Sequence, residues 1–110
     1  MAGEASERIF QDKVEHIAKM NGWMIQHVQP MRSSRGNWMT GGSPGYPDLC
    51  LAHRDRGLIY AELKLENTKL TPAQVMWANA LKPWAEYYVW RPSMMDVIAA
   101  RLGQRASNGG

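Results

Sequence analysis

The chain has 110 residues, of which 45% are apolar and 21% charged, a balance typical of one globular domain and unlike that of disordered proteins. No apolar stretch is long enough to cross a membrane, the first residues lack the pattern of a secretory signal, and the single cysteine, Cys50, excludes a disulfide framework or multi-cysteine zinc site within one chain. The net charge of +3 permits binding to a polyanion without requiring it. These features predict a soluble, cytoplasmic protein.

The N-terminal part of the chain predicts one helix followed by one strand. Apolar side chains recur at the spacing of one helix face over residues 6–21, and Gly22 then ends the helix. The positions on that face are Phe10, Val14, Ile17 and Ala18. Residues 23–28 are rich in aromatic and branched side chains and precede Pro30, which predicts a strand.

A long loop is predicted over residues 30–47. The segment holds four glycines and three prolines and shows no periodic pattern. Loops of this length in a small domain are usually functional or mobile. Arg32 and Arg35 within it are candidate contacts to phosphate groups.

Two apolar-rich runs, 48–53 and 58–65, flank turn residues and predict a β-hairpin. A three-residue loop ending at Gly57 would place Asp48 opposite Lys64. Glu62 would then be the diagonal neighbour of Asp48 on the same face, about 7–8 Å away. The hairpin therefore gathers two carboxylates and one ammonium group.

The rest of the chain predicts two helices around one strand. Thr71, Pro72 and Gln74 match the start of a helix with a capping box, and this helix runs to about residue 82. Residues 86–91 predict a strand, and a last helix runs from Pro92 to about residue 102.

The order helix, strand, strand, strand, helix, strand, helix (αβββαβα) indicates an α/β or α+β fold, with a mixed sheet covered by helices. We expect one domain over residues 1–104 and a disordered tail over 105–110.

The charged cluster of the hairpin has two interpretations. Crowded carboxylates such as Asp48 and Glu62 repel each other and gain from a shared divalent cation, which prefers oxygen ligands. Lys64 would then hold a water molecule or a phosphate oxygen. The alternative is a solvated strand face, on which Glu62 and Lys64 form cross-strand pairs of small value.

Three short motifs carry a resemblance to a known family. They are Gly45-Tyr46-Pro47-Asp48-Leu49, Ile59-Tyr60-Ala61-Glu62-Leu63-Lys64, and Leu70-Thr71-Pro72-Ala73-Gln74 followed by Trp77. Together they resemble the VRR-NUC family of nucleases, which belongs to the PD-(D/E)XK superfamily. The likeness spans residues 7–92, and the motifs are specific in combination although each alone is weak.

The resemblance implies a restriction-endonuclease-like core and a site that binds Mg²⁺ or Mn²⁺ through Asp48, Glu62 and the carbonyl group of Leu63. The family's lysine orients or activates the attacking water, a role that falls on Lys64. The family's first-helix glutamate matches Glu7, which lies within the apolar arc of its predicted helix. The alternative for Glu7 is a solvated acid at a helix start.

Two further residues follow from the resemblance. The family's helix glutamine matches Gln74, although the same side chain is equally explained as the structural partner in a capping box. Lys69 is a candidate DNA contact, but residues 66–68 stand where many members have a glycine-containing linker, which leaves open how Lys69 approaches the nucleic acid.

The implied function is a divalent-metal-dependent endonuclease that hydrolyses phosphodiester bonds in DNA, in a bacterial or phage-infected cell. The predicted substrate is branched DNA such as a Holliday junction, whose two scissile strands are related by two-fold symmetry, so we expect a homodimer. Apolar side chains around the helix after Thr71 fit either an interface or the monomer's own core: Met76, Trp77, Leu81 and Trp84. The alternatives are a nicking or flap endonuclease, and a non-catalytic DNA-binding module of the same fold.

Overall fold

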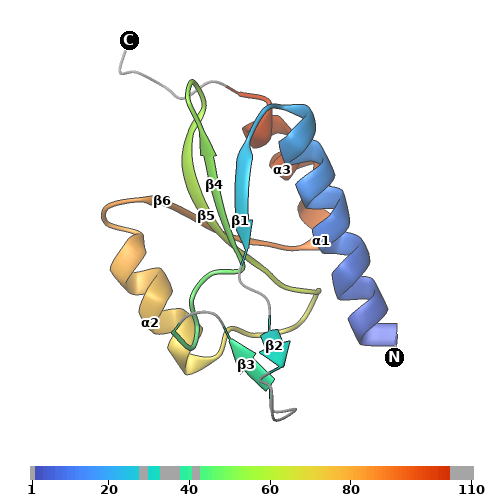
Figure 1. Cartoon of the computed structure of the whole chain (residues 1–110), viewed down its shortest axis with the longest axis vertical. Coiled ribbons are helices and arrows are strands. Elements are labelled where there is room, and N and C mark those ends of the chain that lie inside the picture. The colour runs from blue at the N-terminus through green and yellow to red at the C-terminus, as the bar shows by residue number, and fades with distance from the viewer. Residues whose placement is uncertain (1, 28–29, 33–37, 41–42, 105–110) are drawn as a thin grey trace.

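A computed structural model describes residues 2–27, 30–32, 38–40 and 43–104, with side chains from residue 6 onward but not over 28–42. These residues form a mixed α/β fold with a four-stranded sheet and three α-helices (Figure 1). The elements are α1 (Ala2–Met20), β1 (Met24–His27), β2 (Pro30–Arg32), β3 (Trp38–Thr40), β4 (Leu49–His53), β5 (Gly57–Leu63), α2 (Pro72–Leu81), β6 (Glu86–Trp90), the 3₁₀ turn η1 (Pro92–Met94) and α3 (Met95–Leu102).

The main sheet has the strand order β1-β4-β5-β6. The first three of these strands pair antiparallel, whereas β6 runs parallel to β5 because α2 carries the chain back between them. Figure 1 shows α1 and α3 together on one side of the sheet and α2 on the other side. α1 and α3 therefore cover one face of the sheet, while α2 packs against β6 and leaves Met24 and Leu58 exposed.

The core lies between the sheet and the helices α1 and α3. Leu49 and Leu51 of β4 pair with Ala61 and Ile59 of β5, and all four side chains are fully buried. From α1, the residues of the predicted apolar face join this core: Phe10, Val14 and Ala18 are buried and Ile17 packs at its edge. The helical spacing read from the sequence is thus confirmed. In the described part of the chain no helix combines the length and apolar character needed to cross a membrane.

The segment predicted as one long loop contains two short strands, so that prediction is wrong in part. β2 and β3 pair antiparallel as a separate two-stranded sheet, and the observed element order has two strands more than the predicted αβββαβα. Three-residue strands are too short to show an alternating pattern, and main-chain hydrogen bonds alone can pair them. The backbone of Arg32 lies in β2, while its side chain, Arg35 and the 105–110 tail lie outside the described residues.

The predicted register of the central hairpin is also wrong, by two residues. His53 pairs with Gly57, so the turn consists of Arg54–Arg56 and closes earlier than expected. The cause is local: Nδ1 of His53 accepts hydrogen bonds from the backbone N–H groups of Asp55 and Arg56, at 2.9 and 3.1 Å. Gly57 has a positive φ of 122°, which favours glycine at the end of this turn.

The corrected register changes which charged residues are neighbours. Continuing the pairing of Leu49 with Ala61 by one step places Asp48 opposite Glu62 rather than opposite Lys64. A shift of two residues keeps every side chain on its original face, since side chains alternate with a period of two. The two carboxylates are therefore closer than the sequence predicts.

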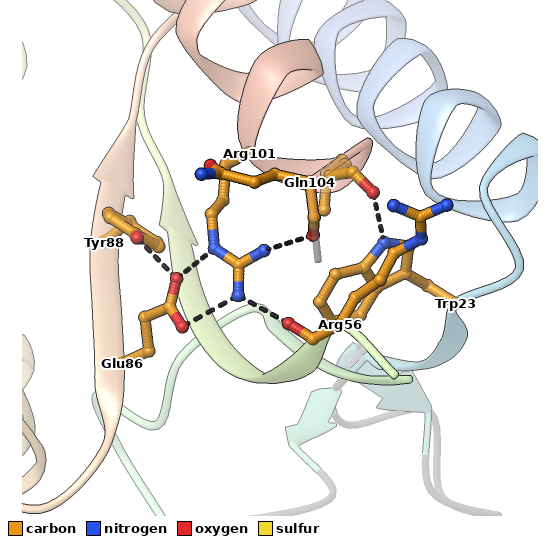
Figure 2. A network of polar contacts seen from close by, with 7 residues as sticks. Trp23, Arg56, Glu86, Tyr88, Arg101 and Gln104 are labelled. Carbon is orange, nitrogen blue, oxygen red and sulfur yellow. Dashed lines mark hydrogen bonds and ion pairs between the residues drawn. The ribbon is translucent and has the colours of Figure 1, made fainter. Parts of the chain in front are cut away.

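A polar network anchors α3 to the sheet (Figure 2). The guanidinium group of Arg101 forms a bidentate ion pair with Glu86 of β6 and donates to the carbonyl oxygen of Arg56 at 2.7 Å. Tyr88 donates its hydroxyl to Glu86, and the Trp23 indole donates to the carbonyl oxygen of Leu102 at 2.8 Å. The hydrogen bonds from Arg101 hold the pKa of Glu86 below its ordinary value.

This network predicts a pH-dependent contribution to stability. Because the pKa of Glu86 is lowered on folding, its pairing stabilises the protein above the ordinary pKa of 4.5 and this contribution is lost as pH falls below it. Replacing Arg101 (Arg101→Met) is expected to lower the free energy of unfolding by about 1–2 kcal/mol at pH 7 and by less at pH 3, measured with urea. Arg54→Met, at an exposed turn position, is the control. Equal destabilisation by Arg101→Met at both pH values would contradict the assignment.

Candidate active site

One pocket of about 340 Å³ lies where α1, β5 and the start of α2 meet. It brings together every residue predicted to act on the metal or in catalysis: Glu7, Asp48, Glu62, Leu63, Lys64 and Gln74. Phe10, Gln11, Leu65 and Thr68 complete its lining. Lys69 is exposed and does not line this pocket.

The carboxyl group of Glu62 is the least solvated charged group described. Its residue is only 1% exposed, and burial is the largest cause that raises its pKa to about 9. A hydrogen bond to Asp48 and the negative charge of that carboxylate raise the pKa further, whereas the positive charge of Lys64 lowers it. Without a bound cation, Glu62 therefore holds a proton at neutral pH.

Asp48 is fixed by the backbone of the neighbouring strand. Its Oδ2 accepts a hydrogen bond from the N–H of Leu63 at 2.8 Å. One residue further along, the N–H of Lys64 donates to the carbonyl oxygen of Trp90 at 2.9 Å, which holds the end of β5 against β6. These bonds keep both carboxylates and the lysine on one rigid segment of the sheet.

The residues before Asp48 pack against α2, and their types explain that approach. Gly45 has φ of 81°, and a Cβ there would lie 2.4 Å from the backbone of Ala73, so only glycine fits. The Tyr46 ring packs edge-on against Tyr60 and Trp77, and the Trp77 indole donates to the carbonyl oxygen of residue 44 at 3.1 Å. This packing leads the chain into the pocket at Asp48.

Gln74 forms the capping box predicted from the sequence. Its Oε1 accepts the N–H of Thr71 at 2.8 Å, and its own N–H donates to the Thr71 hydroxyl at 3.2 Å. The side chain also lines the pocket, and the capping box leaves its amide NH₂ group free to donate. The structural role is therefore observed, and it is compatible with a second role.

Glu7 lies on the pocket wall but stays apart from the carboxylate pair. Its residue is exposed, and among the described residues no group of three His, Cys, Asp or Glu side chains is close enough to hold a metal ion. Among the described residues, the two carboxyl groups that lie next to each other are those of Asp48 and Glu62.

The donor atoms in this pocket fit a hard divalent cation. Oε2 of Glu62 is buried and has no hydrogen-bond partner among the described residues, so once the proton has left, this oxygen is an unpaired acceptor that a cation can satisfy. Asp48 supplies further carboxylate oxygen atoms, the ligand type that Mg²⁺ and Mn²⁺ prefer, and Leu63, whose carbonyl group the family resemblance implies as a ligand, lines the same pocket. A bound cation would take the place of the proton on Glu62.

Sequence reasoning missed Tyr87 behind the carboxylate pair. Its hydroxyl is buried without a hydrogen-bond partner among the described residues, and its pKa is raised to about 12 by burial and then by the charges of Glu62 and Asp48. Tyr87 pairs with Tyr60 in the parallel register of β5 and β6, which no local pattern predicts. Gln11 and Thr68 were missed for the same reason, since only the folded chain brings them to the pocket.

No protein-family model, curated protein or solved structure matches this chain. The site is therefore interpreted from its own geometry and from the motifs of the sequence.

The raised pKa of Glu62 predicts a measurable loss of stability with pH. Because the folded state holds this proton more tightly than the unfolded chain, the free energy of unfolding falls as pH rises between 4.5 and about 9. The slope for one proton is about 1.4 kcal/mol per pH unit. The side chain of Glu62→Gln cannot lose a proton. We therefore expect the free energy of unfolding of Glu62→Gln, relative to that of the wild type, to rise by about 1.4 kcal/mol between pH 6 and pH 7. Urea unfolding in the presence of a metal chelator measures this difference.

The matched control is Asp96→Asn, at an exposed position of α3, which is expected to keep the wild-type slope. If Glu62→Gln also keeps that slope, the carboxyl group is already ionised in the folded protein and the interpretation is wrong.

Proposed function

We propose that this protein is a divalent-metal-dependent nuclease that hydrolyses phosphodiester bonds in DNA. The observation that carries the proposal is the buried Glu62 carboxyl group beside Asp48, in a pocket that Lys64 also lines. Burying the Glu62 carboxyl group next to the half-buried carboxylate of Asp48 costs stability unless a cation or a proton neutralises the pair. A site that needs a divalent cation and presents an ammonium group suits a substrate with negative oxygen atoms.

The residues of the carboxylate pocket would have different roles in the reaction. Asp48, Glu62 and the Leu63 carbonyl group would hold Mg²⁺ or Mn²⁺. When bound, the cation would supply positive charge against the charge that develops on a phosphoryl group. Lys64 would hold the attacking water or a phosphate oxygen with its ammonium group, and Gln74 would donate its free amide hydrogens into the same pocket.

The fold supports the VRR-NUC and PD-(D/E)XK interpretation. That interpretation needs the first carboxylate at the start of one hairpin strand, with the second carboxylate and the lysine on its partner strand. Glu62 lies in β5, while Asp48 lies one residue before β4 and Lys64 one residue after β5, so all three belong to the same hairpin. Glu7 on α1 borders the pocket, where the family's first-helix glutamate is expected.

The carboxylate pair also bears on two other functions. A non-catalytic DNA-binding module has no use for two carboxylates facing phosphate groups, because they repel the substrate and destabilise the fold. A nicking or flap endonuclease would use the same chemistry on a different DNA structure. We favour branched DNA such as a Holliday junction because its two-fold symmetry matches a dimer, and the exposed side chains of Met76 and Trp84 suit a dimer interface.

We expect replacement of one lysine to affect mainly DNA cleavage and replacement of another to affect mainly DNA binding. Lys64→Ala should lower the cleavage rate at least about 100-fold in Mg²⁺ or Mn²⁺, with DNA affinity changed less than about threefold, because its charge acts at the reacting phosphate. Lys69→Ala should leave the rate at saturating protein unchanged and reduce the salt dependence of binding by about one unit of slope. The substrates are single-stranded, duplex, flap and four-way-junction DNA.

The panel distinguishes the candidate functions. Cleavage of the junction in both strands supports the resolvase interpretation, whereas cleavage of one strand or of flaps selects the alternative endonucleases. Metal-independent binding to all four DNAs without any cleavage would reject the nuclease.

An apolar surface on α2 suits the proposed homodimer. The helix contains no charged residue, Met76 is 73% exposed, and Trp84 just beyond its end is 90% exposed. Such a surface is unusual on a monomer and typical of an interface. Trp77 and Leu81, also expected there, are half-buried against the chain itself.

We expect light scattering to show a dimer at micromolar concentration. Met76→Lys should shift it to a monomer, because a charge at the centre of an apolar interface loses its solvation. Met24→Lys on β1 is the matched control, since Met24 is equally exposed at 74% and lies away from α2. A wild-type monomer, or equal effects of both changes, would count against this interface.

A further inference from the structure

A second cavity lies beside the carboxylate pocket and has a different chemical character. It also measures about 340 Å³, and its walls are mainly apolar, with Ile9, Leu65, Pro92 and Met95 among them. Phe10 and Leu65 line both cavities, so the two are adjacent. α1 separates them: Glu7 and Gln11 face the carboxylate pocket, while Ile9 faces the second cavity.

The wall of this cavity is held in place by hydrogen bonds. The carbonyl oxygen of Leu65 accepts from Nη1 of Arg91 at 2.6 Å and from the Thr68 hydroxyl at 2.7 Å. Next to it, Oε1 of Glu66 accepts the N–H of Ser93 at 2.6 Å. Hydrogen bonds from the side chain and then from the backbone of Ser93 lower the pKa of Glu66. The segment after β5 is thus fastened to the start of η1, and the cavity exists before any ligand arrives.

The charge of the lining points to an anionic ligand with a flat apolar part. Lys13 is the one charged side chain on the described lining, and it is exposed at the rim. A nucleotide combines these properties, because its base can pack against Ile9, Leu65 and Met95 while its phosphate lies near Lys13.

We propose that this cavity binds one unstacked nucleotide of the DNA strand whose neighbouring phosphate occupies the carboxylate pocket. The choice of a nucleotide as the occupant rests on the proposed nuclease function. The shared wall of Phe10 and Leu65 makes the two cavities suitable for successive units of one strand. The cavity would thereby favour DNA in which a base is free to leave the stack, such as branch points and single-stranded ends.

The test compares a tetrathymidylate with a tetramer of the same phosphates that lacks all bases. The full chain, with isotope-labelled Ile and Met methyl groups, is titrated in Ca²⁺, which prefers the same oxygen ligands as Mg²⁺. We expect tetrathymidylate to shift the methyl signals of Ile9 and Met95 and to bind about tenfold more tightly than the abasic tetramer.

Two variants that introduce the same negative charge, one in the cavity and one elsewhere on the surface, show whether the advantage of the bases depends on the cavity. Ile9→Glu should remove the tenfold advantage of the bases, because a base that packs in the cavity would strip water from the new carboxylate. Val97→Glu should retain it, since Val97 is 59% exposed on α3, similar to Ile9 at 55%, and does not line the cavity. Equal affinity for both tetramers, or equal effects of both variants, would overturn the proposal.

Cleavage of single-stranded, duplex, flap and four-way-junction DNA in Mg²⁺ and in Mn²⁺ is measured on the same samples. Cleavage without any advantage of the bases rejects the nucleotide cavity and leaves the nuclease function standing. An advantage of the bases without cleavage supports the cavity and rejects the nuclease function.

Discussion

The burial of the Glu62 carboxyl group beside Asp48 is the constraint on which the candidate site depends. A carboxyl group that is 1% exposed loses the water that would stabilise its charge, and a second carboxylate next to it adds repulsion. The fold does not relieve this conflict with a salt bridge among the described residues. A proton or a cation must therefore complete the site, and the hydrogen bond from Leu63 to Asp48 shows that the geometry is fixed in advance.

The residues around Asp48 and Glu62 explain why a few short motifs were enough to predict the candidate site from the sequence. Gly45 is required by the contact with the backbone of Ala73, and Tyr46 and Trp77 pack together beside it. The capping box of Thr71 starts α2 at the edge of the same pocket. Together, the motifs bring a loop, the end of a strand and the start of a helix to the same pocket.

Local chemistry made parts of this structure predictable. The capping box of Gln74 and the buried face of α1 follow from neighbouring residues, and the alternation of β4 and β5 places Asp48 and Glu62 on one face. The exact register was not predictable from length alone, because the ring of His53 closes the turn. The proximity of Tyr87 and the packing of Gln11 on the pocket depend on the parallel strand β6 and on helix placement, which no short pattern records.

The most direct test of the account is whether the carboxylate pair binds one divalent cation. Titration with Mn²⁺, followed by electron paramagnetic resonance and by broadening of backbone NMR signals, should give one site per chain with the strongest broadening at Leu63 and its neighbours. Asp48→Asn should abolish this binding, whereas Asp55→Asn in the exposed β4–β5 turn should retain it. Binding that survives Asp48→Asn, or broadening centred elsewhere in the chain, would contradict the account.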